Sequence, residues 1–393
     1  MASSSSTLSS ESGNCVLPAR DLFRRLAWFV APYFAVAVVL ALLVLRTGEL
    51  LPARLVAWLM NGPVTFVYLD EFSDHSFQFK LESTRLRRPE VLAIGGSRMN
   101  QWRSAMFKPY GFFNASNCLY TQHDYRRFLE GLGDYAPRVV VFSLDFYTFN
   151  PDYDAFFEKV SFSDMDGFGS SEQTGIARRL FGRARADPTV LLPTQREPLH
   201  GVPALGLHAA ETGTGFRRDG SYQYGGVILG RPDSGAASID NAVARVDNGS
   251  VPLLRAAHLD QDRQREFERF AAAARQKGIK LVAITMPYTP RVKQALDRSS
   301  QHGIWREFQN DETARWIRQQ GVIYFNFSDL GSFGGKADEF VDPFHPSETA
   351  YSRMLQVMLQ NPDFAAILPG ISRESIEQRM DKATQFEVYF NEF

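Results

Sequence analysis

Residues 91–97 read VLAIGGS, a short aliphatic run that enters a Gly-Gly-Ser turn. This pattern is typical of a buried parallel strand that opens onto a ligand-facing loop, because a strand covered on both faces is almost continuously apolar. Ser97 would then lie at the carboxyl edge of a sheet, where reactive groups gather in open parallel sheets. Gly-Gly-Ser is also ordinary loop sequence, so by itself it does not define a nucleophile.

Four more apolar runs resemble this strand and alternate with helical sequence. The runs are FFNAS (112–116), RVVVFSLDF (138–146), KLVAITMP (280–287) and VIYFNF (322–327). Apolar residues recur at helical spacing over residues 123–136, 259–278, 303–319 and 347–360. The alternation predicts an α/β fold with three layers, in which a parallel sheet is covered by helices on both faces.

Residues 26–45 read LAWFVAPYFAVAVVLALLVL and carry no charge. At about 1.5 Å per residue such a helix spans the ~30 Å hydrocarbon layer, so we predict a single transmembrane anchor over residues 22–47. A buried core helix and a cleaved signal peptide are the alternatives, but the run lacks a polar face and a small-residue cleavage site. Arg20, Arg24 and Arg25 precede the span and two arginines follow it, a bias that favours a cytoplasmic N-terminus and a periplasmic C-terminal domain.

The rest of the chain divides by composition. We predict a Ser-rich disordered segment over residues 1–21, a juxtamembrane linker over 48–88, the α/β domain over 89–362 with an insertion at 151–255, and a C-terminal tail over 363–393. The insertion is rich in Gly, Pro, Arg and Ser and has no sustained period. The aromatic, acidic end of the tail could dock on the domain or on a partner.

Composition excludes several classes of protein. With 43 Lys and Arg against 44 Asp and Glu, the net charge is −1, which does not supply the basic face that nucleic acid demands. Cys15 and Cys118 are too few for a disulfide framework or a zinc cluster, and the histidines outside the DPFHPSE segment have no metal-ligand spacing. We therefore expect no metal and no cofactor. The basic run ARRLFGRAR (177–185) is most simply a solvated face, although an anionic glycan could use it.

A second chemical signal precedes the last predicted helix. The segment DPFHPSE places Asp342 and His345 three residues apart. A serine needs a base to remove its proton, and the imidazole needs a carboxylate to fix its tautomer and stabilise its positive charge. A parallel sheet can bring the end of its first strand close to a late loop, so we expect Ser97, His345 and Asp342 to be neighbours. Taken alone, this Asp and His could instead be a turn cap and a polar helix start.

The order of these blocks resembles the SGNH, or GDSL-type, hydrolase superfamily. IGGSR with Ser97 is similar to its first block, FFNAS to the second, RVVVFSLDF to the third and DPFHPS to the last. The resemblance covers roughly residues 90–150 and 278–360. An anchor followed by such a domain is similar to envelope proteins that O-acetylate exopolysaccharides, including alginate acetylation proteins, and to D-alanylation proteins of the DltD type. The resemblance implies acyl transfer or deacylation, with Ser97 as nucleophile, His345 as general base and then acid, and Asp342 as its orienting partner.

The sequence departs from the superfamily at the oxyanion hole. Members have Gly in the second block and G-x-N-D in the third, where this chain reads NASNCLY and FSLDFYTFN. Asn114 or Asn117 could donate an amide instead, and Asp145 could be a structural or substrate contact. Losing one oxyanion donor typically costs ~10²- to 10³-fold in turnover.

Two functions of different classes remain. The first is a membrane-anchored, extracytoplasmic O-acyltransferase or esterase that acts on a cell-envelope polysaccharide through an acyl-serine. The second is a non-catalytic scaffold or glycan-binding subunit of an envelope polysaccharide assembly complex, which the missing oxyanion residues, the insertion and the aromatic tail favour. Either function has a glycan as partner and contacts the membrane through residues 26–45. The first adds a membrane protein that passes on acyl groups as a candidate partner.

Overall fold

A five-stranded parallel sheet lies at the centre of the large domain in the computed structural model, which describes residues 19–72, 76–159, 171–192, 199–231 and 238–390. Its strand order is β3-β2-β4-β8-β9. The strands are β2 (Val91–Gly95), β3 (Phe112–Ser116), β4 (Val139–Ser143), β8 (Lys280–Thr285) and β9 (Val322–Asn326). Each of the five predicted strands belongs to this sheet, and every pairing within it is parallel, so the predicted α/β class is confirmed.

Successive residues of the strands bury side chains in two separate cores, as the pleat of a strand requires. Leu92 and Ile94 of β2 lie in one core, and Val91 and Ala93 lie in the other. Both faces of the sheet are therefore covered by helices. The helices of the first face are α3 (Ser76–Arg87), α4 (Gln122–Gly131), α9 (Ile239–Asn248), α10 (Gln261–Gln276), α11 (Pro290–Arg298), α12 (Gly303–Phe308) and α13 (Asp311–Gln319). Those of the second face are α14 (Glu348–Met358), α15 (Pro362–Ile367) and α16 (Arg373–Met380).

Residues 48–88, which we predicted to be a linker, contain ordered elements. Helix α2 (Ala53–Asn61) packs against α3, and strand β1 (Val67–Tyr68) pairs with β5 (Ala204–Leu205) and β6 (Gly215–Phe216) of the predicted insertion. Strand β7 (Tyr222–Gln223) completes this second sheet. The two segments share one apolar cluster, so each covers apolar side chains of the other.

The predicted insertion holds further helices besides those strands. They are α5 (Pro151–Lys159), α6 (Ser171–Ala186), α7 (Leu207–Thr212), α8 (Gly225–Ile228) and the start of α9. The segments 160–170, 193–198 and 232–237 of the insertion lie outside the described residues. Most of these helices are too short for their apolar residues to show a sustained helical period in the sequence.

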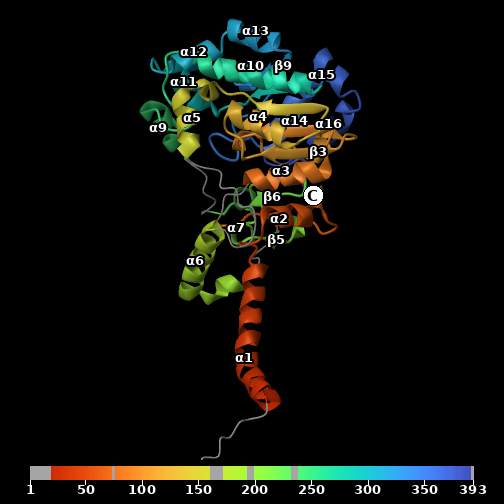
Figure 1. Ribbon diagram of the computed structural model, residues 1–393. Coiled ribbons are helices and arrows are strands. Elements are labelled where there is room, and N and C mark those ends of the chain that lie inside the picture. The colour runs from red at the N-terminus through yellow and green to blue at the C-terminus, as the bar shows by residue number, and fades with distance from the viewer. Residues whose placement is uncertain (1–18, 73–75, 160–170, 193–198, 232–237, 391–393) are drawn as a thin grey trace, which may run out of the picture.

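Helix α1 (Ala19–Arg46) projects from the folded body, and its apolar side chains are exposed over most of its length (Figure 1). It is long and apolar enough to cross a membrane, which agrees with the predicted span over residues 26–45. Of the predicted disordered segment 1–21, residues 1–18 lie outside the described residues and residues 19–21 belong to α1.

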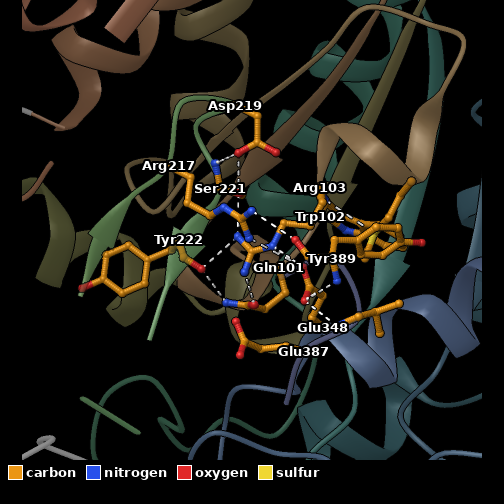
Figure 2. A network of polar contacts seen from close by, with 12 residues as sticks. Gln101, Trp102, Arg103, Arg217, Asp219, Ser221, Tyr222, Glu348, Glu387 and Tyr389 are labelled. Carbon is orange, nitrogen blue, oxygen red and sulfur yellow. Dashed lines mark hydrogen bonds and ion pairs between the residues drawn. The ribbon is translucent and has the colours of Figure 1, made fainter. Parts of the chain in front are cut away.

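The end of the chain docks on the domain. Glu348, the first residue of α14, accepts hydrogen bonds from the backbone N–H groups of Val388 (2.7 Å) and Tyr389 (3.2 Å). The other oxygen of this carboxylate accepts from Arg103 Nε at 2.7 Å, and Arg217 donates to the Tyr389 carbonyl oxygen at 3.3 Å (Figure 2). This buried network joins the predicted tail to the second sheet and to the chain that follows Ser97.

Candidate active site

Ser97 lies immediately beyond β2, as the first residue of the 3-10 turn η1 (Ser97–Met99). The turn needs glycine at position 95, where φ is +142°. A side chain there would place its Cβ 2.6 Å from Ser143 Oγ and 2.8 Å from Met99 Cγ. Gly95 therefore lets the chain pass close to β4 and presents the Ser97 hydroxyl at the sheet edge.

His345 and Asp342 lie in the loop before α14 and meet Ser97 across the domain. The distance between Ser97 Oγ and His345 Nε2 is 2.7 Å, and that between His345 Nδ1 and Asp342 Oδ2 is 2.6 Å. A neutral imidazole with its proton on Nδ1 satisfies both contacts, since it donates to the carboxylate and accepts from the hydroxyl. The structure thus brings Ser97 together with His345, which follows it by 248 positions, and with Asp342.

The Asp342 carboxylate is held in its charged form. Burial acts to raise its pKa, but His345 and the backbone N–H groups of Phe344 (2.8 Å) and His345 (3.0 Å) outweigh burial, so the pKa lies below the usual value. The same backbone bonds fix the loop. A charged, oriented carboxylate is what a histidine needs if it is to take a proton from serine.

Asp145 lies in a different environment. Its carboxylate accepts from Arg98 Nη1 at 2.7 Å and from the Tyr147 hydroxyl at 2.8 Å, and it is buried. Burial raises the pKa of this carboxyl, although both donors oppose that shift. Arg98 also donates to the carbonyl oxygens of Met286 and Pro287. Of the two roles considered for Asp145, the structural one matches these contacts.

The amide of Asn114 is also committed to structure. Its nitrogen donates to the carbonyl oxygens of Met99 (2.9 Å) and Trp102 (3.0 Å), and its oxygen accepts from the backbone N–H of Ser116. Asn117 has a positive φ of 70°, and its backbone N–H donates to the Gly95 carbonyl oxygen. Neither Asn114 nor Asn117 is among the residues that line the cavity beside Ser97.

A cavity of about 240 Å³ opens beside Ser97 and His345. Its walls are mostly aromatic, with Arg98 and the exposed Arg245 as cations; the rings include Tyr120, Tyr147, Tyr153, Phe157, Tyr288 and Phe344. Two of these rings, Tyr120 and Phe157, stack at 4.4 Å between centroids. An aromatic hollow with few polar groups next to a nucleophile suits an acyl chain or the face of a sugar ring.

Two aromatic residues of the site were not predicted from the sequence. The Tyr288 hydroxyl is buried at the cavity and makes no hydrogen bond of normal geometry within the described residues, although the Arg98 guanidinium lies over its ring, 3.9 Å from the centroid. The Tyr224 ring lies 5.8 Å from the His345 ring, between centroids, and Asn100 Nδ2 reaches its hydroxyl at 3.4 Å. Tyr288 directly follows the strand KLVAITMP, so its place at a strand end was a usable signal, whereas Tyr224 lies in the aperiodic insertion.

Comparisons with protein-family models, with curated proteins and with solved structures find no match for this chain. Within the described residues, no group of three or more His, Cys, Asp or Glu side chains could hold a metal ion.

Proposed function

We propose that this protein is a membrane-anchored serine O-acyltransferase or esterase that acts outside the cytoplasm on a cell-envelope polysaccharide. The observation that carries the proposal is the chain of two hydrogen bonds from Ser97 through His345 to Asp342. The resemblance of the IGGSR and DPFHPS blocks to SGNH hydrolases supports the same chemistry, and the length and apolarity of α1 support the anchor.

In the proposed first step, Ser97 Oγ attacks the carbonyl carbon of an acyl donor while its proton moves to His345 Nε2. His345 gives that proton to the oxygen of the departing alcohol, which leaves Ser97 as an acyl ester. A sugar hydroxyl or a water then attacks the ester, His345 takes its proton, and the released serine oxygen recovers that proton. Transfer and hydrolysis share this intermediate and differ only in the second nucleophile.

The negatively charged oxygen that forms during each attack needs hydrogen-bond donors to stabilise it. Ser97 begins η1, where a backbone N–H has no intrahelical acceptor, so its own N–H is one proposed donor. The Tyr288 hydroxyl in the same cavity is the proposed second donor to the bound substrate. These two groups take the place of the glycine and asparagine that the superfamily uses.

A non-catalytic scaffold or glycan-binding subunit is the second candidate. It is favoured by the contacts of Asn114, whose amide donates to backbone carbonyl oxygens and does not line the cavity. On this alternative the aromatic walls would bind a glycan, and the Ser97 hydroxyl would be inert.

Labelling with a fluorophosphonate probe, applied to the full chain in detergent, separates the two candidates. We expect the wild type to be labelled and Ser97→Ala to be unlabelled. Ser299→Ala is a matched control, since Ser299 Oγ lies 2.7 Å from His302 Nδ1 but that histidine bonds the Leu253 carbonyl oxygen rather than a carboxylate. Undiminished labelling of Ser97→Ala, or no labelling of a folded wild type, would refute the enzymatic proposal.

A further inference from the structure

Helix α6 (Ser171–Ala186) and the 3-10 turn η4 (Pro188–Leu191) lie beside the end of α1 that joins the folded body (Figure 1). Val44 in the last turns of α1 shares a buried cluster with Leu180 of α6, Val190 of η4 and Leu207. This cluster fixes α6 at the level where the apolar helix ends.

The opposite side of α6 is exposed and has a mixed character. Arg178, Phe181 and Arg185 are spaced by three and four residues, so they share one face of the helix. The Phe181 side chain is 50% exposed, and Leu192, just beyond η4, is 53% exposed. Because α6 runs alongside α1 (Figure 1), this face stands beside the end of the apolar helix, where arginines and an aromatic side chain can meet lipid headgroups and the acyl boundary together.

The charges on this face are free to bind a partner. Arg178 and Arg185 have neither an ion pair nor a hydrogen bond among the described residues, whereas Arg183, turned inward, pairs with Glu211 at 2.5 Å. Arg46 at the end of α1 is exposed and likewise unpaired within the described part of the chain. Three cations thus lie close to the point where the apolar helix leaves its hydrocarbon layer.

We propose that the exposed face of α6, together with Leu192, stands at the headgroup level of the membrane that α1 spans and binds anionic phospholipid headgroups. The proposal requires α1 to cross a membrane but does not depend on the chemistry of Ser97. Phe181 and Leu192 would enter the boundary between headgroups and acyl chains, while the arginines would pair with lipid phosphates. A soluble anionic glycan would satisfy the arginines but would leave both apolar side chains in water.

The test uses the full chain in lipid nanodiscs made of phosphatidylcholine, with or without phosphatidylglycerol. Phe181→Cys, in a Cys15→Ser background where Cys118 is buried, carries an environment-sensitive NBD label. Ser375→Cys, on exposed α16, carries the same label as a matched control. We expect lipid-borne nitroxide to quench the label at position 181 and not at 375, more strongly in the anionic discs.

The second part of the test removes the two arginine charges of α6. Adding Arg178→Gln and Arg185→Gln should lower the quenching gained from phosphatidylglycerol by about twofold or more, because each arginine attracts anionic lipid. The melting temperature should not change, which shows that the variant is folded. Equal water exposure of positions 181 and 375 in both discs would overturn the proposal. So would a label shift caused by soluble anionic polysaccharide and not by lipid composition.

Discussion

A serine hydroxyl becomes a nucleophile only when a base can take its proton, and a histidine serves as that base only when its other nitrogen is suitably held. Within the described residues two Ser–His pairs lie at 2.7 Å, Ser97–His345 and Ser299–His302. In the Ser299–His302 pair, burial lowers the pKa of His302, and the other ring nitrogen of this histidine contacts the Leu253 carbonyl oxygen. Of these two histidines, His345 is the one with a carboxylate, Asp342, to stabilise its imidazolium, so of the two serines Ser97 is the one expected to react.

Tyr288→Phe tests the proposed second hydrogen-bond donor to the substrate. The hydroxyl makes no hydrogen bond of normal geometry within the described residues, so its removal should not lower the melting temperature, since a buried unsatisfied polar group is lost. If it donates to the substrate, kcat/KM for an ester should fall by about tenfold or more, as losing one such hydrogen bond typically does. Ester turnover and thermal melting of the same samples measure both effects. Unchanged turnover would remove Tyr288 from the mechanism.

At the scale of elements, the site depends on turns that follow different strands. Arg98, directly after the nucleophile, donates to the carbonyl oxygens of Met286 and Pro287, so the turn after β2 is tied to the turn after β8. The Tyr351 hydroxyl of α14 bonds the Arg98 carbonyl oxygen, and α14 follows the loop that carries His345. These contacts hold Ser97, His345 and the cavity wall in one arrangement, as a preorganised site requires.

Glu348 is the buried carboxylate at the start of α14. Glu348→Gln leaves Arg103 buried without its anion and weakens the tail contact, so unfolding free energy should fall by about 3 kcal/mol or more (Figure 2). Urea unfolding of the full chain in detergent, followed by tryptophan fluorescence, measures this change. The control Glu377→Gln breaks an exposed pair with Arg373 and should cost at most about 1 kcal/mol. Equal effects of the two variants would show that the network is not a major stabiliser.

Glu49 lies at the junction between α1 and the domain. Glu49 is buried, and burial raises its pKa from 4.5 to about 7, although it accepts bonds from the backbone N–H groups of Glu71, Phe72 and Leu207. The folded state therefore holds a proton that the unfolded state releases between these pH values, so stability should fall as pH rises from about 4.5 to 7, by roughly 3 kcal/mol.

Glu49→Gln should remove this pH dependence. The difference in melting temperature between wild type and variant should change steadily across that pH window. Glu374→Gln, on the exposed surface of α16, should follow the wild type at every pH. A wild type and a Glu49→Gln variant with parallel pH profiles would contradict the raised pKa.

At the scale of the whole molecule, the sequence predicted the main sheet because its strands are buried on both faces and read as continuous apolar runs. It also predicted the proximity of Ser97 to the Asp342–His345 pair, since parallel strands end at one edge. The second sheet was missed because its strands are two residues long and show no period. The contacts of Asn114 and Asp145 could not be predicted from the sequence. Their hydrogen-bond partners, such as Trp102 and Arg98, come near only in the folded structure.

The most direct test of the central claim is to trap the acylated enzyme. The full chain is incubated with p-nitrophenyl acetate, quenched in acid and mapped by peptide mass spectrometry. We predict one acetyl group on the peptide that contains Ser97, absent from Ser97→Ala, strongly reduced in His345→Ala and retained in Ser299→Ala. A folded wild type that carries no acetyl group, or carries it on another residue, would contradict the account.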